Sequence, residues 1–193
     1  MHATKNKMLQ AGLAMLLERG YHNVGVQDLL NATGTTKSSF YHHFKSKEDF
    51  TLQVIDAYMD EVHEGLHTFL GDDDVAPVQR VRNFFEGTRD KYESEGYLGC
   101  MLGALGQELS GVNETFRGRI DECLMVIGNG IAGALKEAQR RGDLDDNADP
   151  DALAMLVVNA WEGAALRSRL RRGAQPLNDM LDFVLNAVAK DAA

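Results

Sequence analysis

Apolar residues in this 193-residue chain recur three and four positions apart, and no stretch alternates apolar with polar residues. Spacings of three and four place side chains on one face of an α-helix, whereas a half-buried strand needs alternation. The first run of this kind extends from Leu9 to Leu17 and ends at Gly20. The clearest interruption is Gly-Asp-Asp-Asp at 71–74. The pattern therefore predicts an all-α fold.

The predicted helices are short at the N-terminus and long afterwards. Three short helices are expected: one after Thr4, one around Val26–Leu30, and one after Thr35 or Thr36, either of which can cap it. A long helix should start near Ser46 and Lys47 and run to about Leu70, followed by helices at about 75–95, 97–109, 114–141, 149–172 and 176–190. We interpret residues 1–46 as a small head and residues 47–193 as a larger helical-bundle body.

The head has the pattern of a helix-turn-helix. Gly34-Thr35-Thr36 joins two short helices, and glycine supplies the left-handed conformation that such a turn needs. On a helical wheel, Phe40 and Phe44 mark the core side of the third helix. Small hydroxyls and an imidazole opposite them suit base edges, while the flanking Lys and Tyr suit phosphates. The predicted DNA-contacting residues are Thr36, Lys37, Ser38, Ser39, Tyr41, His42 and Lys47, and the alternative is an ordinary solvated face.

The distribution of charge favours this interpretation, although the formal net charge is −9. Residues 1–47 carry six lysines and arginines against two acids, and the remainder carries 14 against 27. A positive head can approach phosphates, while an acidic body keeps other surfaces away from DNA.

Several strings in the head resemble the N-terminal signature of the tetracycline-repressor (TetR) family of transcriptional regulators. They are Gly20-Tyr21, Val26-Gln-Asp-Leu-Leu, Ala32-Thr-Gly34 and Lys37-Ser-Ser-Phe-Tyr-His-His-Phe-Lys-Ser-Lys-Glu48. The resemblance covers residues 4 to about 55; Thr35-Thr36 departs from it, because the family often has Val-Ser there. It implies a homodimer on a palindromic operator in double-stranded DNA, with the third helix reading bases. It also implies a small-molecule inducer that binds the body and re-spaces the two heads; most relatives repress.

The body is expected to supply the dimer contact and the inducer pocket. The last two helices carry an apolar stripe and small residues, which predict a dimer interface of Ala160, Ala164, Leu177, Leu181, Val184, Leu185 and Val188. The pocket is expected among the middle helices, lined by Phe84, Phe85, Tyr92, Cys100, Met101, Leu105, Met125, Trp161 and Glu162. The alternative for both sets is ordinary bundle core.

One motif points to another class of protein. His63-Glu64-Gly65-Leu66-His67 matches the H-E-x-x-H pattern of zinc hydrolases, and Glu86 could be a third ligand. We reject this alternative because so short a motif matches often by chance and this segment falls on the helix that connects head and body. We predict no catalytic residue, metal or cofactor.

The two cysteines, Cys100 and Cys123, do not make a disulfide framework, and no apolar run is long enough for a membrane helix. Both features indicate a cytoplasmic protein. Cys100 lies at a predicted helix start, where a thiolate is stabilised. The Gly99-Cys100 opening is similar to that of a TetR branch with electrophile- and oxidant-responsive repressors. A chemical sensor at Cys100 is therefore a hypothesis, and an inert buried thiol is its alternative.

Overall fold

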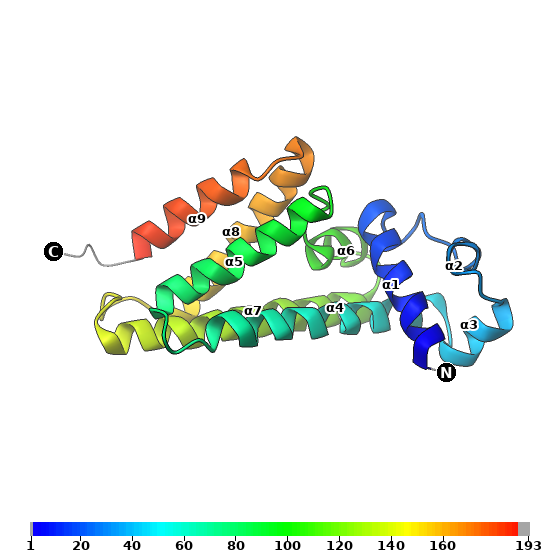
Figure 1. The fold of residues 1–193 in the computed structure, drawn as a ribbon, viewed down its shortest axis with the longest axis horizontal. Coiled ribbons are helices and arrows are strands. Elements are labelled where there is room, and N and C mark those ends of the chain that lie inside the picture. Colours follow the sequence, from blue (N-terminus) through cyan, green and yellow to red (C-terminus); the bar gives the residue numbers. More distant parts are fainter. Residues whose placement is uncertain (1, 189–193) are drawn as a thin grey trace. The chain divides into compact units, whose positions relative to one another are not determined.

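The computed structural model describes residues 2–188, with side chains described for residues 3–185. The helices are α1 (His2–Arg19), α2 (Val26–Thr33), α3 (Lys37–His43), α4 (Lys47–Leu70), α5 (Pro77–Ser94), α6 (Met101–Leu109), α7 (Glu114–Arg141), α8 (Pro150–Arg171) and α9 (Gln175–Val188) (Figure 1). Within 2–188 no residue belongs to a strand, so the predicted all-α fold is confirmed. None of the described helices is both long and apolar enough to cross a membrane.

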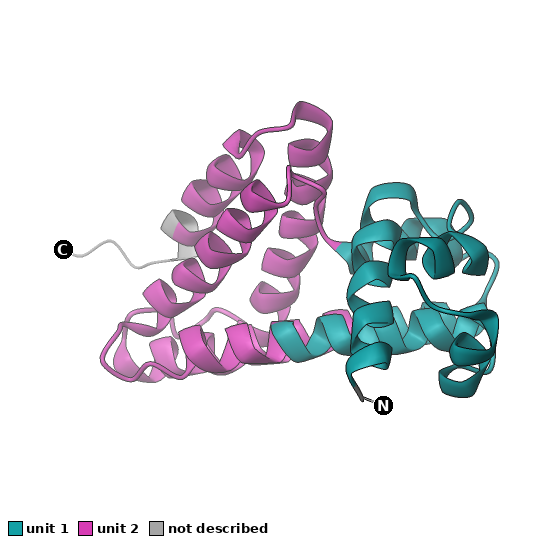
Figure 2. Ribbon diagram, turned by 45° about the vertical axis from the view of Figure 1, so that its right-hand side comes forward, with its two compact units in different colours: residues 1–61, 101–120 teal, residues 62–100, 121–193 magenta. Residues whose placement is uncertain are grey.

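The contacts divide the chain into two compact units (Figure 2). The first contains residues 1–61 and 101–120, and the second contains residues 62–100 and 121–193. The chain therefore passes between the units within α4, at the Cys100–Met101 peptide bond, and within α7. This division differs from a cut at residue 46, because α6 and the first turns of α7 belong to the same unit as the head.

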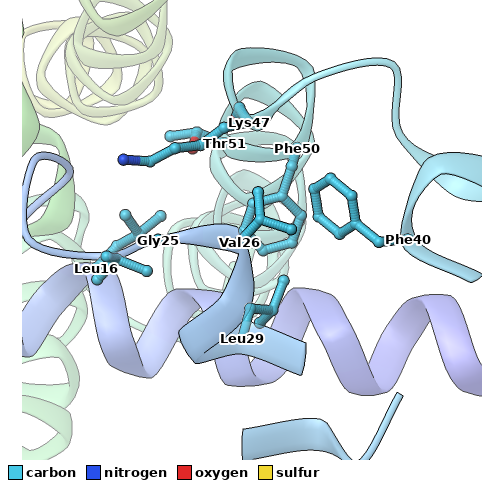
Figure 3. A pocket seen from close by; sticks show the side chains of 9 residues that line it. Leu16, Gly25, Val26, Leu29, Phe40, Lys47, Phe50 and Thr51 are labelled. Carbon is cyan, nitrogen blue, oxygen red and sulfur yellow. The ribbon is translucent and has the colours of Figure 1, made fainter. Parts of the chain in front are cut away.

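Three aromatic rings form the core of the first unit. Phe40, Phe44 and Phe50 are buried, with ring centroids 5.0–5.6 Å apart. Figure 3 shows Phe40 and Phe50 beside Val26, around a cavity of about 10 Å³. That volume holds about one water molecule, so this cavity is too small for a small-molecule ligand.

A buried arginine connects several segments of the second unit by hydrogen bonds. Arg80 of α5 is only 2% exposed, and its guanidinium donates to both carboxylate oxygens of Glu137 in α7, at 3.0 and 3.4 Å. It also donates to the carbonyl oxygens of Leu70 and Val75, at 3.3 and 2.7 Å. A buried charge is tolerated where it is paired and hydrogen-bonded in this way. Arg80 therefore ties together α5, α7 and the end of α4.

One helix begins later than the spacing predicts. The helix expected at about 97–109 begins at Met101, because Gly96, Tyr97 and Gly99 have φ angles of 75°, 59° and 80°. A left-handed residue cannot continue a right-handed helix. Cys100 therefore lies just before α6 instead of inside a helix.

Candidate nucleic-acid interface and ligand site

The turn between α2 and α3 depends on Gly34. Its φ of 63° is left-handed, which costs little for glycine, and its N–H donates to the carbonyl oxygen of Leu30. Thr33 is buried and its hydroxyl donates to the carbonyl oxygen of Leu29 at 2.7 Å. Thr36 caps α3 by accepting the N–H of Ser39 at 3.2 Å. Together these bonds form a helix-turn-helix, as predicted.

The two sides of α3 differ sharply in exposure. Phe40 and Phe44 have 0 and 1% of their surface exposed, while Tyr41 is 51% exposed. The predicted DNA-contacting residues that lie exposed on this surface are Thr36, Lys37, Ser38, Tyr41 and His42. Ser39 is half-buried. An exposed face of hydroxyl, imidazole and ammonium groups, held by a buried aromatic side, is suited to a DNA groove.

Lys47 lies in different surroundings from the other predicted contacts. Its ammonium donates to the carbonyl oxygen of Tyr21 at 2.6 Å and lies 4.0 Å from the Tyr21 ring centroid. Burial lowers the pKa of Lys47, and the charges of Glu108 and Asp28 partly oppose this. One of the three N–H donors of this ammonium is therefore already used inside the protein. Lys45 lies two residues earlier and is exposed, and the helical wheel of α3 does not predict it as a DNA contact.

Six of the nine predicted pocket residues belong to the second unit's interior. The rings of Phe84, Phe85, Tyr92 and Trp161 are buried. The ring centroids of the pairs Phe84–Phe85, Phe85–Trp161 and Trp161–Tyr92 are 4.6–6.0 Å apart. Burial raises the pKa of Glu162, and a hydrogen bond with the Cys100 side chain opposes this shift. Aromatic rings, a thiol and a carboxyl group are residue types that line small-molecule sites.

The other three predicted pocket residues lie elsewhere. Met101 and Leu105 are buried residues of α6, in the first unit. Met125 is 42% exposed within the single chain. The reason is helical phase: α7 buries Cys123 and Ile131, and Met125 falls on the opposite side of the helix.

Comparison with known proteins identifies the family. A family model described as "Bacterial regulatory proteins, tetR family" matches residues 8–54, and one described as "Tetracyclin repressor-like, C-terminal domain" matches residues 77–184. The transcriptional regulator AcuR of Cereibacter sphaeroides is 37% identical over 172 residues, which cover 89% of this chain and 78% of the relative. The chain belongs to the TetR family.

Further relatives of this TetR-family chain agree. The HTH-type transcriptional repressor DhaR of Mycobacterium sp. strain GP1 is 31% identical, over 95% of this chain and 91% of the relative. A crystal structure of regulatory protein TetR from Rhodobacter sphaeroides superposes with a TM-score of 0.91 at 35% identity, covering 95% of this chain and 97% of that one. The protein is a DNA-binding transcriptional regulator, and binding DNA as a dimer and release by a ligand are typical of its family.

The apolar stripe predicted as a dimer interface belongs to the regulator's own core. Leu177, Leu181 and Leu185 are at most 2% exposed within the single chain, so they have no surface left to bury against a partner. Ala164 is also buried, Ala160 and Val184 are half-buried, and the side chain of Val188 lies outside the described residues. The strongest apolar stripe of a helix marks its core side, and the three leucines lie on that side within the single chain.

The opposite side of the same two helices is open. Leu156 and Leu170 of α8 and Phe183 of α9 are 58, 67 and 78% exposed. An open groove of about 320 Å³ also involves α8 and α9, and it is lined by Gly163, Ala164, Arg167, Arg171, Pro176 and Asp179. Large exposed apolar side chains gathered on one face of a protein mark an interaction surface.

The H-E-x-x-H segment lies on α4. His63, Glu64 and His67 are all exposed, and Glu86 pairs with Arg82 at 3.8 Å. Among the described residues, no group of three or more His, Cys, Asp or Glu side chains could hold a metal ion.

Proposed function

We propose that this TetR-family regulator is a homodimeric repressor that reads a palindromic operator with α3 and is released by a small-molecule inducer. It acts by binding and not by catalysis, and in the cytoplasm, where the operator is. The observation that carries the proposal is the polar, exposed face of α3, held outward by the buried rings of Phe40 and Phe44. The positive charge of residues 1–47 supports the approach of this face to phosphates.

The first prediction concerns the DNA sequence that the protein selects. Repeated selection from a random duplex library should enrich a palindrome bound by two chains, with affinity falling steeply as salt rises. Lys37→Ala and Lys45→Ala should each weaken binding to all duplexes, because each removes one phosphate contact. Each should also reduce by about one the slope of the logarithm of the binding constant against the logarithm of the salt concentration. Lys136→Ala, in the second unit and paired with Asp151, is the matched control and should change neither value. If the selection enriches no common sequence, the proposed function is wrong.

For the dimer contact, we propose the open face of α8 and α9. Leu156, Leu170 and Phe183 would become the apolar centre of an interface between two copies, and the groove beside Gly163 would admit the partner's helix. A two-fold interface uses the same patch on both copies, so one such face per chain is sufficient.

For the inducer, we propose a site at the aromatic cluster of the second unit, with Cys100 as its reactive group. The hydrogen bond between Cys100 and Glu162 supports this choice, because a carboxylate beside a thiol can accept its proton as the sulfur attacks an electrophile. The sulfur would add across an activated carbon–carbon double bond, and the proton would finally reach the neighbouring carbon. The adduct adds bulk to a packed interior, which responds by discrete rearrangement.

The second prediction tests Cys100 with N-ethylmaleimide. Wild-type protein and a Cys123→Ser control should gain one adduct at Cys100 and leave the selected duplex. Cys100→Ser should stay bound. To change the ratio of DNA-bound to released protein from 99:1 to 1:99, the adduct must favour the released state by about 5.5 kcal/mol. If adduct mass and duplex binding are followed together, an unmodified Cys100, or equal release of Cys100→Ser, contradicts the sensing role.

A further inference from the structure

One side chain of α6 holds the loop that leads into the reading helices. The carboxylate of Glu108 accepts the N–H of Tyr21 through Oε2 and the N–H of His22 through Oε1, each at 2.7 Å. The preceding residue, Gly20, is left-handed with a φ of 78°, and a Cβ built there would lie 2.7 Å from Oε2. Glycine at position 20 therefore makes room for the carboxylate as well as for the turn.

The same loop is held from two other helices. The ammonium of Lys47 in α4 donates to the carbonyl oxygen of Tyr21 at 2.6 Å. The Tyr21 ring packs edge-on against Phe116 of α7, with centroids 5.3 Å apart. The N–H and the carbonyl oxygen of Tyr21 are thus both bonded to charged side chains, and all these residues belong to the first unit.

Helix stability does not explain a glutamate at position 108. It lies in the last turn of α6, where the helix dipole disfavours a negative charge. Its carboxylate also lies beside the C-terminal end of α1, where the dipole has the same sign. Two short charge-assisted hydrogen bonds and the nearby Lys47 charge offset both penalties. The carboxylate is therefore stabilised by the loop amides and by Lys47, and not by its own helix.

We propose that Glu108 is a positioning residue for DNA binding, which clamps the α1–α2 loop and so sets how α2 and α3 are presented. The proposal rests on the proposed function, because it assigns Glu108 a part in operator affinity.

Amide hydrogen exchange at Tyr21 and His22, measured by NMR, tests the clamp without DNA. Glu108→Ala should make both amides exchange about tenfold faster or more, because each loses its charged acceptor. Glu108→Gln keeps one amide oxygen as acceptor and should give an intermediate rate. Glu64→Ala, which removes an exposed glutamate of α4, is the matched control and should leave both rates unchanged.

Affinity for the selected palindrome tests the positioning role. Glu108→Ala should bind about tenfold more weakly, Glu108→Gln between it and wild type, and Glu64→Ala like wild type. If Glu108→Ala does not fold, as judged by circular dichroism, Glu108→Gln takes its place in both measurements. Unchanged exchange, or faster exchange with unchanged affinity, overturns the proposal. A wild-type protein that enriches no duplex would instead overturn the proposed function, which keeps the two failures apart.

Discussion

Replacing Arg80 with alanine is expected to lower the free energy of unfolding by about 3–5 kcal/mol. Arg80 is 2% exposed, and its guanidinium bonds the Glu137 carboxylate and two backbone carbonyl oxygens. Without it, the carbonyl oxygens of Leu70 and Val75 lose this donor, Glu137 keeps its ion pair with Arg141 alone, and the volume of the side chain is left empty. Few single substitutions in this chain should cost more.

Urea unfolding followed by circular dichroism measures this loss. Arg140→Ala is the matched control, since Arg140 is an exposed arginine of α7, and it should stay within about 0.5 kcal/mol of wild type. Arg80→Lys keeps a charge but cannot reproduce the forked donor geometry, so it should fall between the two. A loss below about 1 kcal/mol for Arg80→Ala would show that the second unit does not depend on this residue.

Gly163→Leu should abolish the dimer and lower operator affinity by about a hundredfold or more, because the two heads would no longer bind together. Within the single chain, a Cβ at position 163 meets nothing within 4 Å. Replacing a glycine inside α8 should even stabilise the isolated chain slightly. Only a partner helix seated on this face would clash with the new side chain.

Gly133→Leu is the matched control, because Gly133 of α7 is also open within 4 Å and lies inside a helix. Sedimentation equilibrium should find Gly133→Leu dimeric and Gly163→Leu monomeric, with similar circular dichroism. If Gly163→Leu remains a dimer with wild-type operator affinity, the two chains must meet through another surface.

Features fixed by neighbouring residues could be predicted from the sequence. The Gly34 turn, the Thr36 cap and the inward rings of Phe40 and Phe44 all depend on residues within a few positions of one another. Helical spacing is sufficient to place such residues on one side of a short helix. The fold class and the helix-turn-helix therefore follow from the order of the amino acids alone.

Contacts between distant residues could not be predicted in the same way. Glu108 and Tyr21 are 87 positions apart, and no local pattern marks either as a partner of the other. The hydrogen bond from Lys47 to Tyr21 could not be predicted for the same reason.

The proposed dimer face shows another limit of periodicity. Helical spacing finds the stripe with the most apolar residues, which is the core side containing Leu177 and Leu181. The outward face of α8 is interrupted by Gly163 and Arg167, so it does not stand out as a stripe. Only burial in the folded chain tells the two faces apart.

Direct reading of bases by α3 is tested best by one set of affinities. Wild type, His42→Ala and Tyr41→Ala are each measured against the selected palindrome and against every single base-pair substitution in it. His42→Ala should lose about 1–3 kcal/mol of discrimination at symmetric positions of the two half-sites, while Tyr41→Ala weakens all duplexes alike. If both variants keep the wild-type preference at every position, α3 does not read the operator.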